Sequence, residues 1–149
     1  MQRISRLLTR VKTTRNMASS TSLSEKRVNV FGRPLLIHSE DPMTGFFRNG
    51  YCDTNASDSG NHTIASVVSD KFLDYSAAKG NNLRPVGLRD GCKWCLCVNR
   101  WKEAFDAYRR GEVSMDTVPR VVLGSTHIRA LEGGIRMDQL EEFKFEEKK

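Results

Sequence analysis

The chain has 149 residues, 38% of them hydrophobic, which suits one domain with a core of its own. No apolar run approaches the roughly 18 to 20 residues that a membrane-spanning helix needs, so a membrane-spanning protein is not expected. The net charge of +6 comes mainly from the first 24 residues, which hold five bases and no acid, so the remainder lacks the concentrated basic surface that nucleic-acid binding needs.

Residues 1–16 have the pattern of a mitochondrial targeting segment. A row of arginines lies beside one apolar helical face, which is formed by Ile4, Leu7, Leu8 and Val11. A basic amphipathic helix without acids is typical of transit peptides, so we expect a matrix location, with the mitochondrial import machinery as a partner. A second start at Met17 would give a cytoplasmic product instead, and residues 17–27 form a Ser/Thr-rich linker.

A single globular domain is predicted over residues 28–145, followed by a charged tail at 146–149. Its first elements are two short strands, at 28–31 and 35–38, joined by a Gly-Arg-Pro turn. Residues 39–60 are rich in Asp, Asn, Gly and Ser and are expected to form an ordered loop. A loop of that length is uncommon and is often functional.

The rest of the domain alternates strands and helices. Strands are predicted at residues 63–68, 93–97 and 120–123, the last as a central strand, and helices at about 69–79 and 100–110, with a short C-terminal helix near 137–145. Ser69 and Asn99 are the expected N-caps of the two principal helices. The pattern predicts an α+β fold, with a small mixed sheet of short strands beside two principal helices.

The four cysteines are Cys52, Cys92, Cys95 and Cys97, and no secretory signal precedes them. A reducing compartment is therefore expected, where thiols are more often free, metal-bound or catalytic than paired in disulfides. Alternate residues of a strand share a face, so Cys95 and Cys97 are expected to point the same way. Cys92 lies in a Gly-rich turn and is expected to take no part in chemistry.

One interpretation of these residues is a reactive thiol. Cys97 is the first choice, because the start of the following helix, with Arg100 in its first turn, provides a positive field that favours a thiolate. Cys95 is the second choice. The candidate bases are His62 and His127, and His127 directly follows a predicted strand, where ligand-binding groups often lie.

Two other interpretations stay open. Thiolates are strong, soft ligands, so Cys52, Cys95, Cys97 and His62 are a possible tetrahedral zinc site, with zinc as the cofactor. Alternatively the cysteines are only buried, in a non-catalytic mitochondrial binding or assembly module with an exposed apolar patch. The favoured hypothesis is a Cys/His-lined site for an unknown small molecule, and the sequence does not decide whether the domain is an enzyme.

Three further residues are candidates for binding that small molecule. Arg48 follows two phenylalanines and is a candidate anion clamp. Thr126 lies beside the histidine at the predicted strand end, and Arg100 lies near the favoured thiol. Trp94 and Trp101 are expected to be core anchors rather than ligand platforms.

Four long motifs, with Trp and Cys in fixed order, lie within residues 28–140: Asp41 to Cys52, Gly60 to Thr63, Lys93 to Ala104, and Val121 to His127. Through these motifs the chain resembles the family called domain of unknown function 2237. The resemblance implies a small compact domain, mostly bacterial, with no established activity.

Overall fold

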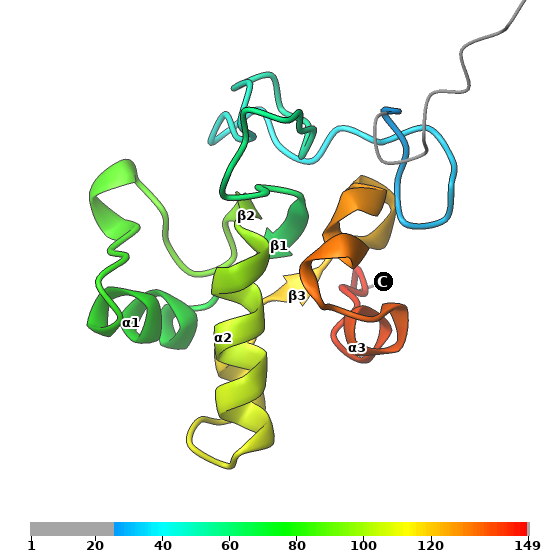
Figure 1. Ribbon diagram of the computed structural model, residues 1–149. Coiled ribbons are helices and arrows are strands. Elements are labelled where there is room, and N and C mark those ends of the chain that lie inside the picture. Colours follow the sequence, from blue (N-terminus) through cyan, green and yellow to red (C-terminus); the bar gives the residue numbers. More distant parts are fainter. Residues whose placement is uncertain (1–25, 149) are drawn as a thin grey trace, which may run out of the picture.

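A three-stranded antiparallel sheet lies at the centre of the protein. The computed structural model describes residues 26–148, and the predicted targeting segment over 1–16 lies outside them (Figure 1). The strands are β1 (Ile64–Val67), β2 (Lys93–Leu96) and β3 (Arg120–Val121), in the spatial order β2-β1-β3. Both pairings with β1 are antiparallel, and an isolated parallel bridge joins Val121 to Lys144.

Three α-helices accompany this sheet, so the predicted α+β class is confirmed. They are α1 (Asp70–Ala78), α2 (Val98–Arg109) and α3 (Met137–Glu142). Short 3₁₀ turns connect the elements: η2 (Arg84–Val86), η3 (Met115–Thr117), η4 (Leu123–Ser125) and η5 (Ile128–Gly133). Ser69 caps α1 as predicted, because its side chain accepts a hydrogen bond from the backbone N–H of Phe72. None of the helices described is long and apolar enough to cross a membrane.

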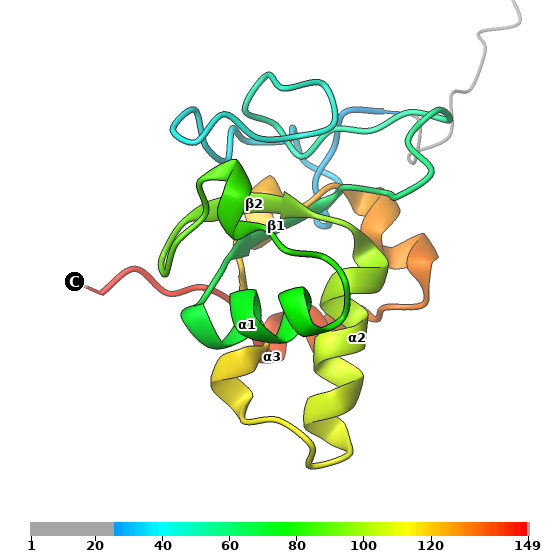
Figure 2. The same cartoon turned by 90° about the vertical axis from the view of Figure 1, so that its left-hand side faces the viewer.

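The sheet separates two unlike layers. In both views the three helices lie below it, whereas the irregular segment that precedes β1, residues 26–62, lies above it (Figures 1 and 2). We call that segment the loop layer. The site described below lies where the loop layer meets the first turn of α2.

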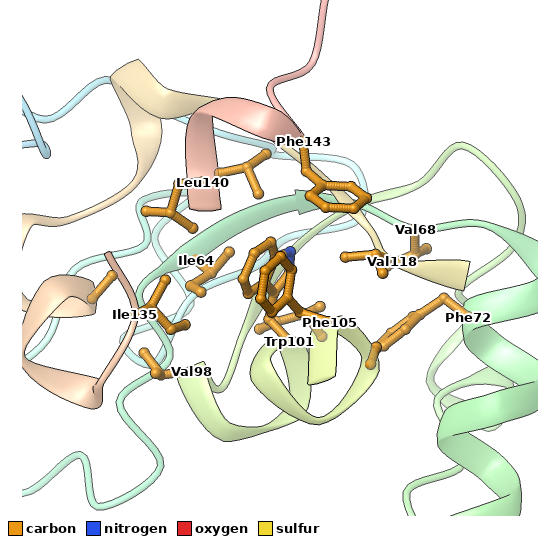
Figure 3. Packing of buried hydrophobic residues seen from close by; sticks show 14 of the residues in the cluster. Ile64, Val68, Phe72, Val98, Trp101, Phe105, Val118, Ile135, Leu140 and Phe143 are labelled. Carbon is orange, nitrogen blue, oxygen red and sulfur yellow. The ribbon is translucent and has the colours of Figure 1, made fainter. Parts of the chain in front are cut away.

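Aromatic side chains fill the core on the helical side (Figure 3). Trp101 stacks on Phe105 one turn along α2, with 5.2 Å between ring centroids, and Phe143 packs edge-on against both rings. The indole N–H of Trp101 donates to the Pro119 carbonyl at 3.0 Å, so its one polar atom is satisfied. This packing fixes α2, and with it the residues at its start.

The loop layer has little regular backbone structure and is attached to the sheet through side chains. A disulfide joins Cys52 to Cys95 in β2, and Thr44 accepts a hydrogen bond from the backbone N–H of Cys95 at 2.8 Å. The buried ring of His38 donates through Nε2 to the Ser66 carbonyl in β1 at 3.0 Å. These attachments hold the loop layer against the strands.

Two strand predictions were wrong. Residues 28–38 form only one bridge with each other, between Val28 and Pro34, because several of their other backbone groups pair with residues distant in sequence. The amide of Val30 donates to the Thr126 carbonyl, for example. The segment predicted as a central strand, 120–123, contains only the two-residue edge strand β3, and β1 is central.

The start of α2 also differs from the prediction. The helix begins at Val98, and its N-cap is Cys97 rather than Asn99. The preceding strand ends at Leu96, so Cys97 lies between strand and helix instead of at the end of a longer strand. The alternation of side chains that was expected to place Cys95 and Cys97 on one face therefore stops before Cys97.

Candidate functional site

A tight turn from Asp58 to His62 carries two of the site's functional side chains. The backbone N–H of Asn61 donates to the Asp58 carbonyl, and the N–H of His62 donates to Asp58 Oδ2 at 2.9 Å. Asn61 has a φ of 48°, in the left-handed region that Asn tolerates better than most residues. The same carboxylate oxygen accepts from the Thr54 hydroxyl at 3.0 Å. Asp58 thus organises the backbone of the turn on which His62 lies.

The imidazole of His62 is held by the other oxygen of that carboxylate. His62 Nδ1 lies 2.6 Å from Asp58 Oδ1, the length of a strong charge-assisted hydrogen bond. Burial alone would raise the pKa of Asp58, but its hydrogen bonds from His62 and Thr54 outweigh burial, and the pKa is lowered. Asp58 is therefore an ionised, buried partner that orients the ring.

The side chain of Cys97 lies beside the same imidazole. A hydrogen bond with the Cys97 side chain is the largest cause that raises the pKa of His62, which reaches about 9; burial opposes the rise and the bond to Asp58 adds to it. Gly60 lies against both groups: a Cβ there would be 2.6 Å from His62 Cε1 and 3.2 Å from Cys97 Sγ. The Val98 amide donates to the Asn61 carbonyl at 3.1 Å, which ties the start of α2 to the turn.

A pocket of about 280 Å³ opens beside this group. It is lined by Phe46, Arg48, His62, Leu83, Val86 and Trp94. The Arg48 guanidinium lies over the Trp94 indole, 4.9 Å from the ring centroid, and donates to the Gly45 carbonyl at 2.9 Å. The Phe46 ring stacks on His62 at 6.3 Å between centroids. The site therefore combines a thiol, an imidazole, a carboxylate and a small pocket with mainly apolar walls.

Two sulfur predictions need correction. Cys52 and Cys95 are joined in a disulfide, so neither provides a thiolate, although thiols were expected to stay unpaired. Cys95 is consequently not the second-choice nucleophile, and the proposed zinc set of Cys52, Cys95, Cys97 and His62 loses two of its ligands. Among residues 26–148 no group of three or more His, Cys, Asp or Glu side chains is arranged to hold a metal ion.

Two candidates at the end of β3 have structural roles. His127 is buried, and its Nδ1 accepts a hydrogen bond from the backbone N–H of Arg129. Burial is the main cause that lowers the pKa of His127, and the carboxylate of Asp53 opposes it. Thr126 is fully buried and bonds to backbone groups of β1 and of the segment after β3. The structure brings His62, and not His127, to Cys97.

The two candidate arginines lie in different places. Arg48 lines the pocket with His62. Arg100 lies on the exposed side of α2, where it pairs with Glu103 at 3.3 Å and borders a separate, shallow cavity of charged side chains. Arg100 is therefore engaged away from the thiol pocket.

Sequence reasoning did not single out Asp58 or the pocket role of Trp94. Asp58 precedes His62 by four residues, and that spacing was the one signal available in a loop full of polar residues. Trp94 packs against the core as expected, and it also lines the pocket. Trp101, by contrast, is wholly a core residue.

Residues 28–144 match the model of a family described as an uncharacterised protein conserved in bacteria, DUF2237. No curated protein shows significant similarity to the chain. The matched region includes the Asp58 to His62 turn, Cys97 and the whole pocket lining, so the site lies entirely within the family domain. The chain belongs to the DUF2237 family.

Proposed function

We propose that this domain is a thiol-dependent enzyme in which Cys97 is the nucleophile, His62 exchanges a proton with it, and Asp58 orients His62. The observation that carries the proposal is the arrangement of three side chains: the Asp58 carboxylate lies 2.6 Å from His62 Nδ1, and the Cys97 sulfur lies beside the same ring, next to Gly60. A nucleophile needs an adjacent base, and the base needs a third group that fixes its orientation. These three residues have those relations.

The charge state of the site supports this role. The pKa of His62, about 9, keeps its ring protonated at neutral pH, so the ring can donate a proton to a leaving group. The N-terminus of α2, which begins directly after Cys97, adds a partial positive charge. Because His62 Nδ1 is bound to Asp58, we assign to His62 Nε2 the proton that the ring exchanges with the Cys97 sulfur.

Acyl transfer to water is the reaction class that suits these groups. The Cys97 thiolate attacks a carbonyl carbon, the new carbon–sulfur bond forms, and the bond to the leaving group breaks as His62 donates its proton to that group. Neutral His62 then takes a proton from water, whose oxygen attacks the thioester. The carboxylic acid is released, and the thiolate and the imidazolium are restored.

The proposal is tested by the rate at which Cys97 is alkylated. Cys92 is a second free, half-buried cysteine in the same chain and serves as an internal control. With iodoacetamide at pH 7, without reductant so that the disulfide stays intact, we expect Cys97 to react at least about ten times faster than Cys92. Peptide mass spectrometry measures labelling at both positions.

Variants separate the three roles. His62→Gln should bring the labelling rate of Cys97 down to that of Cys92, because the positive partner is lost. Asp58→Asn should give an intermediate rate, because the ring stays in place with a weaker partner. Equal labelling of the two cysteines in the unmodified protein, or fast labelling of Cys97 that His62→Gln leaves unchanged, would contradict the proposal.

A further inference from the structure

The lining of the pocket beside His62 contains the cationic side chain of Arg48 and no acidic side chain. The imidazole of His62, which also lines the pocket, is paired with the Asp58 carboxylate, so Arg48 is the cation that a ligand in this pocket would meet. The carboxylate of Asp58 is buried and is hydrogen-bonded to the His62 imidazole, so it is not available to pair with Arg48. An occupant of this pocket is therefore favoured if it carries a negative charge.

Arg48 differs from most arginines of the chain in having no acidic partner. Among residues 26–148, seven arginines pair with a carboxylate: Arg27, Arg84, Arg100, Arg109, Arg110, Arg129 and Arg136. Arg33, Arg89 and Arg120 have no such pair in that part of the chain, but none of them lines the pocket. Within the same part of the chain, Arg48 contacts the Gly45 carbonyl, through Nη1, and the Trp94 ring. The edge formed by Nε and Nη2 is left for a ligand, and that edge matches a carboxylate bidentately.

The backbone conformation at Arg48 also helps to place its guanidinium over Trp94. Arg48 has a φ of 52°, which is uncommon for a residue with a long side chain and concentrates at functional sites. Its amide donates to the Gly45 carbonyl, the same oxygen that its guanidinium binds. The exposed side chain of Arg48 is thus held over Trp94 at the edge of the pocket.

Resting on the proposed function, we infer that the substrate of Cys97 is a small acyl compound with an apolar body and a carboxylate. The carboxylate binds Arg48, and the apolar body packs against Trp94, Leu83 and Val86. The electrophilic carbon lies at His62, the residue of the pocket lining that neighbours Cys97. The volume of about 280 Å³ is at the lower end for ligand pockets, which favours a compact compound such as an acylated branched-chain amino acid over a long peptide.

A pair of reagents that differ only in charge tests this inference. N-iodoacetyl-leucine and N-iodoacetyl-leucinamide have the same reactive carbon and the same apolar group, but only the first has a carboxylate. We expect the acid to label Cys97 about ten times faster than the amide, because a charge-assisted bidentate bond forms only with the acid. Arg48→Gln should bring the ratio of the two rates close to one, and Arg48→Lys should leave it in between.

Arg33→Gln is the matched control. Arg33 is an exposed arginine outside the pocket, and its loss should leave the ratio of rates unchanged. A ratio near one in the unmodified protein, or a ratio that survives Arg48→Gln, would overturn the inference.

Binding without chemistry separates this inference from the proposed function. Calorimetric titration of the Cys97→Ser variant with N-acetyl-leucine should show binding that N-acetyl-leucinamide lacks and that Arg48→Gln removes. Binding of the acid together with an inert Cys97 would contradict the proposed function and support the anion pocket. Fast labelling by iodoacetamide with no preference for the acid would contradict only the anion pocket.

Discussion

Thr126 has a structural role because its buried hydroxyl bonds to two backbone groups. The hydroxyl of Thr126 accepts from the Ala65 amide at 3.1 Å and donates to the Val122 carbonyl at 3.0 Å, so it joins β1 to the segment after β3. Thr126→Val keeps the shape and removes both bonds, leaving a buried amide unpaired. We expect a loss of about 1–3 kcal/mol in the free energy of unfolding, measured by urea denaturation.

The control for this substitution is the reactivity of the site. The hydroxyl of Thr126 bonds to Ala65 and Val122, and Thr126 does not line the pocket, so the alkylation rate of Cys97 should be unchanged in the folded variant. An unchanged free energy of unfolding would show that the Ala65 amide finds another partner, and a changed alkylation rate would show that Thr126 acts on the site.

Some residues of the candidate site could be identified from the sequence, and others could not. Cys97 and His62 were predicted because few residue types do thiol chemistry, and the chain has few of them. Asp58 was missed because a carboxylate in a loop of Asp, Asn and Ser has no distinguishing pattern until the fold places an imidazole on it. Cys95 was misassigned because its partner, Cys52, lies 43 residues away and pairing across that separation has no local signal.

At the scale of elements, the Asp58 to His62 turn depends on Gly60. An alanine Cβ at Gly60 would lie 2.6 Å from the His62 ring, which cannot swing away while Asp58 holds it. We expect Gly60→Ala to displace the imidazole from Cys97 and to slow alkylation of Cys97 about tenfold, with the labelling of Cys92 as reference.

Gly124→Ala is the matched control for Gly60→Ala. Its Cβ would meet only the side chain of Leu36, at 3.2 Å, and Leu36 is exposed and free to move. Alkylation of Cys97 should be unaffected in the Gly124→Ala variant. If Gly60→Ala also left the rate unchanged, the imidazole would not be the group that activates the thiol.

Elements with a local signal were predicted well, and elements that depend on distant partners were not. The periodic apolar residues of α1 and α2, and the Ser69 cap, place both helices within about two residues. Residues 28–38 have β-type composition, but the amides of Val30 and Leu36 bind Thr126 and Gly124, so pairing within the segment stops at the single Val28–Pro34 bridge. The pocket could not be predicted, because it joins loop, turn, 3₁₀ and strand residues from position 46 to position 94.

For the molecule as a whole, two histidines should shape the dependence of stability on pH. Burial is the main cause that lowers the pKa of His38 from 6.5 to about 4, so between these values the unfolded state binds more protons and stability rises with pH. The pKa of His62 is raised from 6.5 to about 9, so above 6.5 the folded state binds more protons and stability falls as pH rises.

These two contributions together predict a stability maximum near pH 6.5. Thermal unfolding midpoints measured from pH 4 to 10 would show it. His62→Gln should flatten the alkaline limb, and His38→Gln should make the acid limb less steep, because the lowered pKa of His127 also contributes to that limb. An alkaline limb that persists in His62→Gln would assign it to other groups.

The targeting segment over residues 1–16, with its alternative start at Met17, stays a prediction, because it lies outside the described residues and the family match begins at residue 28. A matrix location therefore depends on sequence pattern alone.

The separation into helical and loop layers has a consequence for how such a domain can diversify. Phe46, Arg48 and Val86 border the pocket, are exposed, and do not belong to the aromatic core around Trp101. If the pocket binds ligands as we propose, substitutions at these three positions would alter which molecules are accepted while the scaffold keeps its folding energy. Ligand preference and foldability would then be encoded by nearly separate sets of residues, and a lineage could change one without risking the other.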